Sequence, residues 1–432
     1  MSRWLRLAFF PLWLLGAAPA LAAPWPAVES DLPPDPALRQ GTLPNGLRYA
    51  ILPNAEPKNR ISLRLLVAVG SLHERDDELG LAHFVEHMAF RSTRSHPAGS
   101  MVATLQRLGV GLGPDNTAFT FPDHTIYQLE LPDTTEATLR DGLGVFREYA
   151  EEVTFDAPLI EKERGVILSE NATRDTPTAR SGLANLAMLW PDSRQVRRPV
   201  GGVSETVRSF TREQFVAFYD AWYRPERMSV IAVGDLAPEQ AQALIEAEFG
   251  NLHPRGAARA EPADIVTAEA RLPDVGIFSD AGLLGVQISL EHPRSHPRTE
   301  DTHARRTQLL HEALAVGLLQ ARLQKIAHEA EATFVTPTAQ LLSPMAEWQL
   351  ASISAAGKID DWTKVAAELE REHRRTFQFG FTVRELAEAK AGLATLYDEA
   401  TRTAATRRSE MLAGQLADCL IAGAPFVHPT EM

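Results

Sequence analysis

The sequence contains a single cysteine, Cys419, among its 432 residues, so no disulfide bond can form within the chain. It also contains no low-complexity tract, and its lysines and arginines are dispersed among the acidic residues. Together with a formal net charge of −13, this distribution argues against nucleic acid as a partner. A hydrophobic content of 44% instead indicates a globular protein that is stabilised by the burial of ordinary apolar cores.

After the N-terminus, the sequence lacks any run that is long and apolar enough to span a membrane. At the N-terminus, Arg3 and Arg6 precede a short apolar run over residues 7–18. Small residues up to Ala22 follow, so residues 1–22 are expected to form a cleaved secretory signal peptide. An uncleaved membrane anchor is the alternative, but the apolar run is too short to favour it. We therefore expect an exported, periplasmic protein with no stable membrane span after cleavage.

The chain is longer than one ordinary core can fill, and its pattern divides into two domains. The first domain carries a strong hairpin signal, Asn45-Gly46, between two apolar runs. Its expected strands cover residues 41–54, 61–70, 116–131 and 227–235, and its expected helices cover residues 78–90, 101–110, 135–152, 158–174, 211–223 and 237–249. This succession predicts an α+β fold, with mainly antiparallel sheets packed with helices.

Composition sets the expected boundaries between the domains. The expected segments are a linker at 23–38, a first domain at 39–250, a second linker at 251–264, and a second domain at 265–432 that begins with strands over 275–280 and 285–292. Cys419 falls on an expected buried helix face and is interpreted as structural.

The second domain looks like a faint copy of the first. Residues 381–399 share the helix pattern of residues 155–170, but Ala389 and Leu396 stand where the first domain has glutamates. Fewer residues follow this helix than in the first domain, and the segment YRPERMSVIAVGD does not recur. The second domain is therefore expected to bind no metal and to be truncated at its C-terminus.

The strongest chemical signal lies in residues 80–90, GLAHFVEHMAF. On a helix, His83 and His87 share one face, so both imidazoles can be directed at one point. Glu86 lies on the same side, where a carboxylate can act as general base for a water held by zinc. The alternative is a helix with surface histidines and a salt-bridged glutamate, and a third metal ligand would decide between the two.

Residues 161–170, EKERGVILSE, supply the candidate third ligand. Glu163 and Glu170 are two helical turns apart and share one face. The apolar run 166–168 indicates a substantially buried helix, in which unpaired carboxylates are costly. Glu170 is therefore predicted to complete a site for one Zn²⁺ per chain. In the alternative, the helix is amphipathic and Glu163 pairs with a neighbouring basic residue in solvent.

These motifs resemble the pitrilysin-type inverzincin zinc metallopeptidases, which include insulysin and the mitochondrial processing peptidases. The resemblance rests on GLAHFVEHMAF, on EKERGVILSE at the usual downstream distance, and on YRPERMSVIAVGD. It covers residues 39–250 well and the second domain more loosely, and the second domain is most like the long exported bacterial members. The family implies the roles of zinc ligand for His83, His87 and Glu170, of general base for Glu86, and of a carboxylate that orients a ligand histidine for Glu163.

The strand that lines the family's substrate cleft usually reads Asn-Ala-aromatic-Thr. Here DNTAFT places Thr117 at the asparagine position and Asn116 one residue earlier, which departs from the family pattern. Pairing of a substrate strand with Ala118 and Phe119 uses main-chain groups and is still expected. After the histidine helix, FRST likewise places Ser92 where the family often has glycine.

The resemblance also implies a chamber that closes between two halves of two domains each, so this chain is expected to form half of a clamshell peptidase. The second half supplies an arginine and a tyrosine in the family. Peptide substrates and such a second half, either a C-terminal part of a longer chain or another subunit, are the expected partners of a zinc metalloendopeptidase. The alternatives are a non-catalytic family subunit for assembly or peptide binding, and a structural zinc domain, which would need a fourth protein ligand. No obvious fourth ligand is present, since the nearest candidates in sequence, His73 and His124, are interpreted as loop residues.

Overall fold

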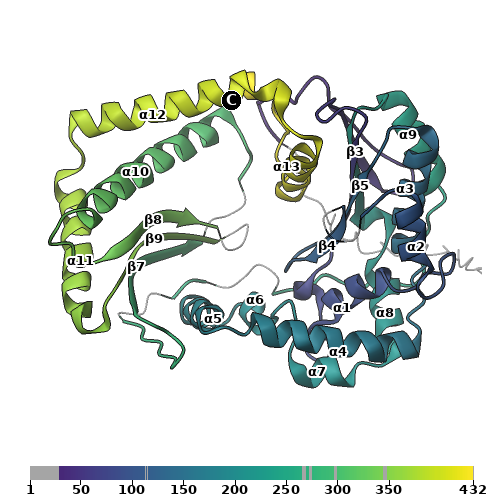
Figure 1. Ribbon diagram of the computed structural model, residues 1–432, viewed down its shortest axis with the longest axis horizontal. Coiled ribbons are helices and arrows are strands. Elements are labelled where there is room, and N and C mark those ends of the chain that lie inside the picture. The colour runs from purple at the N-terminus through teal and green to yellow at the C-terminus, as the bar shows by residue number, and fades with distance from the viewer. Residues whose placement is uncertain are drawn as a thin grey trace, which may run out of the picture.

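The computed structural model describes residues 29–111, 113, 115–264, 269–271, 275–295, 299–343 and 348–431. The expected signal peptide lies outside the described residues, as does the first part of the expected linker at 23–38. Figure 1 shows two units, each consisting of a sheet and the helices packed on it. The predicted α+β class, with two mainly antiparallel units, is confirmed.

A six-stranded sheet forms the centre of the first unit, in the order β1–β2–β6–β3–β5–β4. Its strands are β1 (Arg39–Thr42), β2 (Arg48–Pro53), β3 (Ile61–Val67), β4 (Asn116–Thr120), β5 (Thr125–Leu131) and β6 (Met228–Gly234). Strands β2 and β6 pair in parallel, and the other pairs are antiparallel. The expected hairpin forms because Gly46 takes a φ of 92° and the Asn45 amide donates to the carbonyl of Phe249.

Helices cover one face of this sheet and enclose the main apolar core. They are α1 (Leu81–Ala89), α2 (Ser100–Arg107), α3 (Glu136–Glu151), α4 (Ala157–Arg174), α7 (Ser204–Ser209), α8 (Arg212–Trp222) and α9 (Pro238–Phe249). The short helix α6 (Arg194–Arg197) precedes α7 in the chain. Phe84 of α1 packs against Phe210, which precedes α8, and against Phe215 of α8 itself. The expected capping box of Thr211 and Gln214 begins α8.

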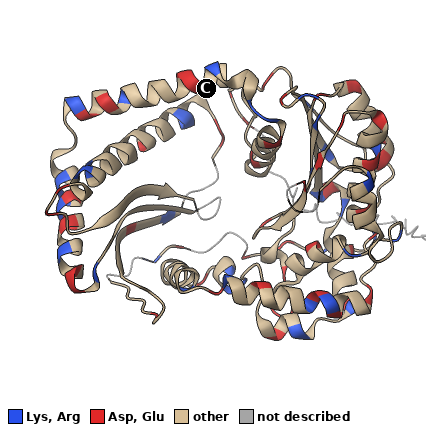
Figure 2. Cartoon of the chain, in the orientation of Figure 1, with Lys and Arg blue, Asp and Glu red and all other residues tan. Residues whose placement is uncertain are grey.

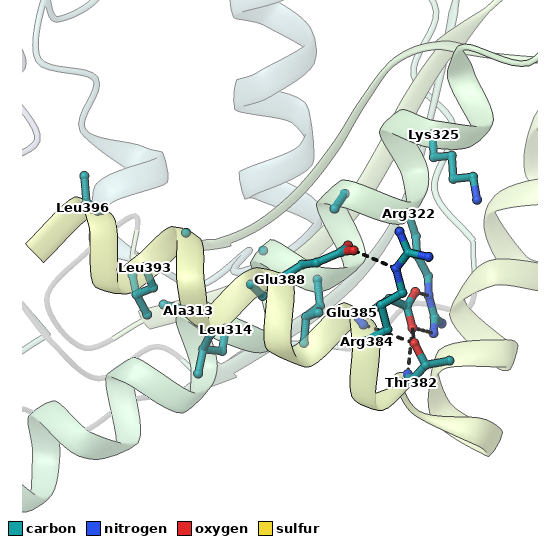
Figure 3. Close-up of a pocket in the computed structure, with 15 residues that line it drawn as sticks. Ala313, Leu314, Arg322, Lys325, Thr382, Arg384, Glu385, Glu388, Leu393 and Leu396 are labelled. Atoms are coloured by element: carbon teal, nitrogen blue, oxygen red, sulfur yellow. Dashed lines mark hydrogen bonds and ion pairs between the residues drawn. The ribbon is translucent and has the colours of Figure 1, made fainter.

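The second unit is built on three antiparallel strands in the order β7–β9–β8. These are β7 (Val286–Ser295), β8 (Val335–Leu342) and β9 (Trp348–Gly357), which pack against α10 (His303–Ala327) and α11 (Trp362–Phe379). Helix α12 (Val383–Arg402) contacts α10. A groove of about 750 Å³ lies between α10 and α12. Figure 3 shows Leu314 and Leu393 toward one end of it and the Arg322–Glu385 ion pair toward the other.

Each unit sends one helix to the sheet of the other. Helix α5 (Pro177–Leu189) leads into Trp190, whose ring stacks on that of Trp348 in β9, with centroids 4.7 Å apart. Helix α13 (Ser409–Ala422) places Leu416 in an apolar cluster on the second face of the six-stranded sheet, and Figure 1 shows it beside that sheet. This exchange fixes the two units against each other through two buried contacts.

Two expectations differ from this fold. Residues 275–280 form no strand, and Ile277 is 91% exposed. The corresponding strand of the first unit, β2, is held by β6, and the described part of the second sheet has no strand beside β7 that could hold residues 275–280 in this way. Residues 409–422 were expected in the second domain but pack on the first sheet, because that sheet has a second apolar face to be covered.

Within the described residues, no helix has both the length and the apolar character needed to cross a membrane. Figure 2 shows basic and acidic residues interspersed along the helices of both units. This distribution agrees with the dispersed charge of the sequence. The expected boundaries at 39–250, 251–264 and 265–432 stay a prediction, apart from the packing of α13.

Candidate metal centre

Helix α1 begins at a glycine that has no side chain to cap it. Gly80 has a φ of 95°, and the carboxylate of Glu74 accepts hydrogen bonds from the N–H groups of Gly80, at 2.9 Å, and Ala82, at 2.8 Å. Burial raises the pKa of Glu74, and the two N–H donors oppose that rise because they favour the ionised form. Glu74 thereby fixes the start of α1 just before His83.

The two histidines of α1 face each other on one side of the helix, as their spacing predicted. The Nε2 atoms of His83 and His87 lie 3.2 Å apart, and the rings meet edge to face with centroids 4.6 Å apart. His83 is buried and His87 is half-buried. Burial lowers the pKa of His83 to about 3, with the nearby charges of His87 and Arg174 adding to the effect. His83 is therefore neutral near pH 7, which is the form that binds metals.

Helix α4 brings the predicted third group to this point. Glu170 Oε2 lies 3.4 Å from Nε2 of His87 and 3.8 Å from Nε2 of His83, and its other oxygen is paired with Arg174. The helix is less buried than its apolar run indicated, since Val166 is 42% exposed. The face that carries Ile167 and the glutamates is the one that packs inward or lines the cluster.

The three donor atoms fit a divalent metal. Tetrahedral zinc with ligand bonds of about 2.0–2.2 Å separates its ligand atoms by roughly 3.3–3.6 Å. The observed separations of 3.2, 3.4 and 3.8 Å are close to this range. Two imidazole nitrogens and one carboxylate oxygen are also the donor set of catalytic zinc sites that leave one position open. His83, His87 and Glu170 could therefore hold zinc.

Glu163 contacts the ring nitrogen of His87 that points away from the other two candidate ligands. Its carboxylate is 1% exposed and accepts a hydrogen bond from Nδ1 of His87 at 2.9 Å, which leaves Nε2 of His87 with its lone pair. Arg91 donates to the same carboxylate at 2.7 Å. Burial would raise the pKa of Glu163, but the hydrogen bonds from His87 and Arg91 outweigh it and lower that pKa. Glu163 is thus an anion buried with two partners, and not a solvent-exposed glutamate paired with Arg164.

Glu86 lies beside the cluster as a second buried carboxylate. Thr120 of β4 donates to its Oε2 at 2.9 Å. Burial raises the pKa of Glu86 to about 7, although the charge of His87 and the Thr120 hydrogen bond act in the opposite direction. A carboxyl group with such a pKa can exchange protons near neutral pH, as a general base or acid must.

The other two histidines that were considered as ligands lie elsewhere. His73 is buried and its Nε2 lies 3.3 Å from the Glu261 carboxylate, and His124 stacks on Phe121 and contacts the Asp123 carboxylate. Among the described residues, His83, His87 and Glu170 are the group of three that could share a metal, and no fourth protein ligand joins them. This arrangement fits an open catalytic site better than a closed structural one.

The predicted substrate strand is β4, an edge strand that pairs with β5 on one side. Asn116 is buried, Thr117 and Ala118 are half-buried, and Phe119 is 48% exposed. A cavity of about 340 Å³ lies between β4, α1 and α2. Its lining includes Glu86, His87, Phe90, Met101, Leu105 and residues 116–118. The cluster is therefore next to both an open strand edge and a partly apolar cavity.

Three residues of this region were not predicted from the sequence: Thr120, Arg91 and Arg174. Thr120 could have been found, because it follows Ala118 by two residues and so lies on the same face of the strand. Arg174 could also have been found, because it lies four residues after Glu170 on α4, the spacing of a helical ion pair. Arg91 carries no comparable local signal, since its partner Glu163 lies on α4 and is brought to it by the packing of α1 on α4.

The sequence matches two family models along most of its length. Residues 49–188 match insulinase (peptidase family M16), and residues 209–393 match the peptidase M16 inactive domain. The structure superposes on the crystal structure of the first half of the periplasmic protease PqqL from Escherichia coli with a TM-score of 0.84 and 31% identity. That match covers 93% of this chain and 85% of the other. The chain belongs to the M16 peptidase family.

Relatives of this M16 chain are named as zinc proteases. The probable zinc protease PqqL of E. coli is 31% identical over 424 residues, and that of Haemophilus influenzae is 33% identical over 303 residues. The matched region covers 97% of this chain and 45% of the E. coli relative, and 70% of this chain and 33% of the H. influenzae relative. The chain therefore matches less than half the length of either relative. The crystal structure of pitrilysin, at 18% identity and a TM-score of 0.66, shares the fold.

Proposed function

We propose that this chain is the zinc-binding half of a periplasmic metalloendopeptidase that hydrolyses peptides in an enclosed chamber. The observation that carries the proposal is the convergence of His83, His87 and Glu170 beside the buried carboxylate of Glu86. The names of the relatives support the chemistry, since they are described as zinc proteases, and E. coli PqqL is described as periplasmic. Export through a signal peptide at residues 1–22 belongs to the same proposal.

Zinc, Glu86 and Glu163 have separate roles in the proposed hydrolysis. When bound, zinc acts as a Lewis acid that polarises the scissile carbonyl group and the attacking water. Glu86 removes a proton from that water and delivers it to the leaving nitrogen, for which a pKa of about 7 is well suited. Glu163 holds His87 in the orientation and tautomer in which the lone pair of Nε2 is free to bind the metal.

The peptide substrate has a place beside this machinery. We assign it to the open edge of β4, where main-chain groups of residues 116–119 pair with an extended peptide. One substrate side chain then enters the adjacent cavity, whose apolar lining by Phe90, Met101 and Leu105 favours an apolar group. A second two-domain half, as a further part of a longer chain or as another subunit, closes the chamber over the peptide.

The metal assignment is tested by the zinc content of purified variants. We expect about one zinc per wild-type chain and loss of stoichiometric zinc in His87→Ala, because two ligands cannot hold a catalytic site. His253→Ala, which changes an exposed histidine, is the matched control and should keep its zinc. Elemental analysis after dialysis measures both, and full zinc retention in His87→Ala would overturn the assignment.

A second experiment, on Glu86, distinguishes an enzyme from a non-catalytic binding subunit. Glu86→Gln preserves shape and hydrogen bonding but cannot accept the water's proton, so it should keep zinc and lose peptide hydrolysis by about 10²–10⁴-fold. Cleavage is measured with a quenched peptide after assembly with the second half, with and without a chelator. An assembled wild-type protein that binds zinc but cleaves no peptide would instead favour the non-catalytic alternative.

A further inference from the structure

One loop touches both helices that carry the metal-ligand candidates. Residues 198–203 connect α6 to α7 and contain the pair Gly201-Gly202. Asn171, which directly follows Glu170 on α4, donates from its amide to the carbonyl of Gly201 at 2.7 Å. Just after the loop, Thr206 donates to the carbonyl of Leu79 at 2.6 Å, immediately before the start of α1. The loop thus lies between the last turn of α4 and the first turn of α1.

The two glycines make this contact possible because no side chain fits there. A Cβ atom on Gly202 would lie 2.2 Å from the carbonyl oxygen of Leu79 and 2.6 Å from Cα of Gly80. Gly202 also has a φ of 70°, which favours glycine. A Cβ atom on Gly201 would lie 2.2 Å from Oδ1 of Asn171. Backbone therefore packs directly on backbone at α1, and on an amide side chain at α4.

The first residue of this loop, Arg198, is also bonded to the segment that precedes α1. Glu74 binds the N–H groups of Gly80 and Ala82 through its carboxylate, and its own carbonyl accepts a hydrogen bond from Arg198 at 2.8 Å. Ser71 donates to the carbonyl of Arg198 at 3.0 Å. The start of α1 therefore cannot move away from the loop without breaking buried hydrogen bonds, and any enlargement of the loop must act on α4.

We propose that the Gly201-Gly202 turn, held by Asn171, is a spacer that sets the distance between His83 on α1 and Glu170 on α4. The inference rests on the proposed function, because it assigns a positioning role toward the metal those residues hold. Ligand atoms must be placed within about 0.5 Å for productive coordination. A contact in which one added carbon atom meets backbone at 2.2 Å is therefore able to disturb the site.

The test measures zinc affinity by competition with a chromophoric chelator, which needs no enzyme activity. Asn171→Ala and Gly202→Ala should each weaken zinc binding by about 10- to 100-fold, as loss of groups that orient metal ligands commonly does. With cobalt in place of zinc, both variants should also change the visible absorption that reports ligand geometry. Asn171→Ala adds no atoms, so it carries the test if Gly202→Ala fails to fold.

Two matched controls separate spacing from stability. Gly165→Ala changes a glycine of α4 whose added Cβ would meet nothing within 4 Å, and Asn185→Ala removes an amide that binds Glu291 away from the cluster. Both should keep wild-type zinc affinity and cobalt spectrum. Unchanged affinity and spectrum in Asn171→Ala and in folded Gly202→Ala would overturn the spacer alone. A wild-type protein that binds no zinc would overturn the proposed function and the spacer with it.

Discussion

Glu261 joins the segment 251–264 to the first sheet through two buried partners. It pairs with His73 at 3.3 Å and with the Arg227 guanidinium, which lies over the ring of Trp222. Burial would raise the pKa of Glu261, but the hydrogen bond from His73 and the charge of Arg227 lower it to about 2. An ordinary glutamate in the unfolded chain has a pKa of 4.5. The ionised form is therefore favoured by folding.

This difference predicts a defined pH dependence. Because the folded-state pKa is the lower one, the stabilisation by Glu261 is present above about pH 4.5 and is lost as the pH falls toward 2. Glu261→Gln should lower the midpoint of thermal unfolding at pH 7, and the difference from wild type should shrink below pH 4.5. Glu269→Gln, at an exposed position, is the control. A difference that stays constant from pH 7 to pH 3 would contradict this account.

Single residues of the site differ in how far the sequence could predict them. His83, Glu86 and His87 were predictable because helical periodicity alone places them on one side of α1. The burial of Glu163 and its bond to His87 required the resemblance, since sequence spacing equally allowed a solvent-exposed pair. Thr120 and Arg174 each have a local pattern, the alternation of β4 for Thr120 and the i,i+4 spacing to Glu170 for Arg174. The contact of Arg91 with Glu163 depends on how α4 approaches α1, and this tertiary packing leaves no local pattern.

At the scale of elements, the exchange of α5 and α13 is what joins the two units. Leu416 of α13 is 1% exposed in the apolar cluster on the first sheet, which includes Leu66 and Ile231. Leu416→Ala should reduce the free energy of unfolding by about 2–5 kcal/mol, through lost burial and a cavity. Met411→Ala, on the same helix but 44% exposed, should change it by about 0.5 kcal/mol or less.

Chemical denaturation measures both variants, and hydrogen exchange in β3 and β6 locates the effect. Loss of exchange protection in these strands for Leu416→Ala is the expected result, because α13 covers them. Equal stability of the two variants would show that α13 contributes nothing to the first unit.

The elements of the first unit were largely predictable from sequence, and those of the second unit were less so, because tertiary contacts decide more of the second. Strands β3 and β6 are buried on both faces and consist mostly of apolar residues, so their type could be recognised from sequence even though β3 also contains Ser62 and Arg64. Residues 275–280 have an equally apolar pattern but no neighbouring strand to hold them. The packing of α13 on the first sheet could not be predicted either, because an apolar helix face does not indicate which sheet it will cover.

At the scale of the whole molecule, the two units differ in how completely their sheets are paired. Strand β3 is bordered by β5 and β6, whereas its counterpart β7 pairs with β9 and has no described partner on its other edge. Open edges of this kind are sites of further pairing or of aggregation. The groove between α10 and α12 is a second open feature of this unit.

These features lead to a prediction about the chain acting alone. Every candidate ligand lies between His83 and Glu170 on the first unit, so the isolated chain should bind zinc stoichiometrically. The chain matches the first half of PqqL, and in the proposed enzyme the second half completes the chamber. Loss of transition-state contacts from such a half commonly costs 10²–10³-fold in rate. Zinc content and activity should therefore separate: full metal, with little cleavage of a quenched peptide.

The experiment compares the monomer, isolated by size exclusion, with the same chain after addition of the second half in trans. Cleavage should rise by about 10²–10³-fold on addition, and a chelator should abolish it, because both the metal and the transition-state contacts are then required. Glu86→Gln chain with the second half is the control that excludes activity of the added half itself. Strong chelator-sensitive cleavage by a verified monomer would mean that one half suffices, and that the open site beside β4 already holds every group the reaction needs.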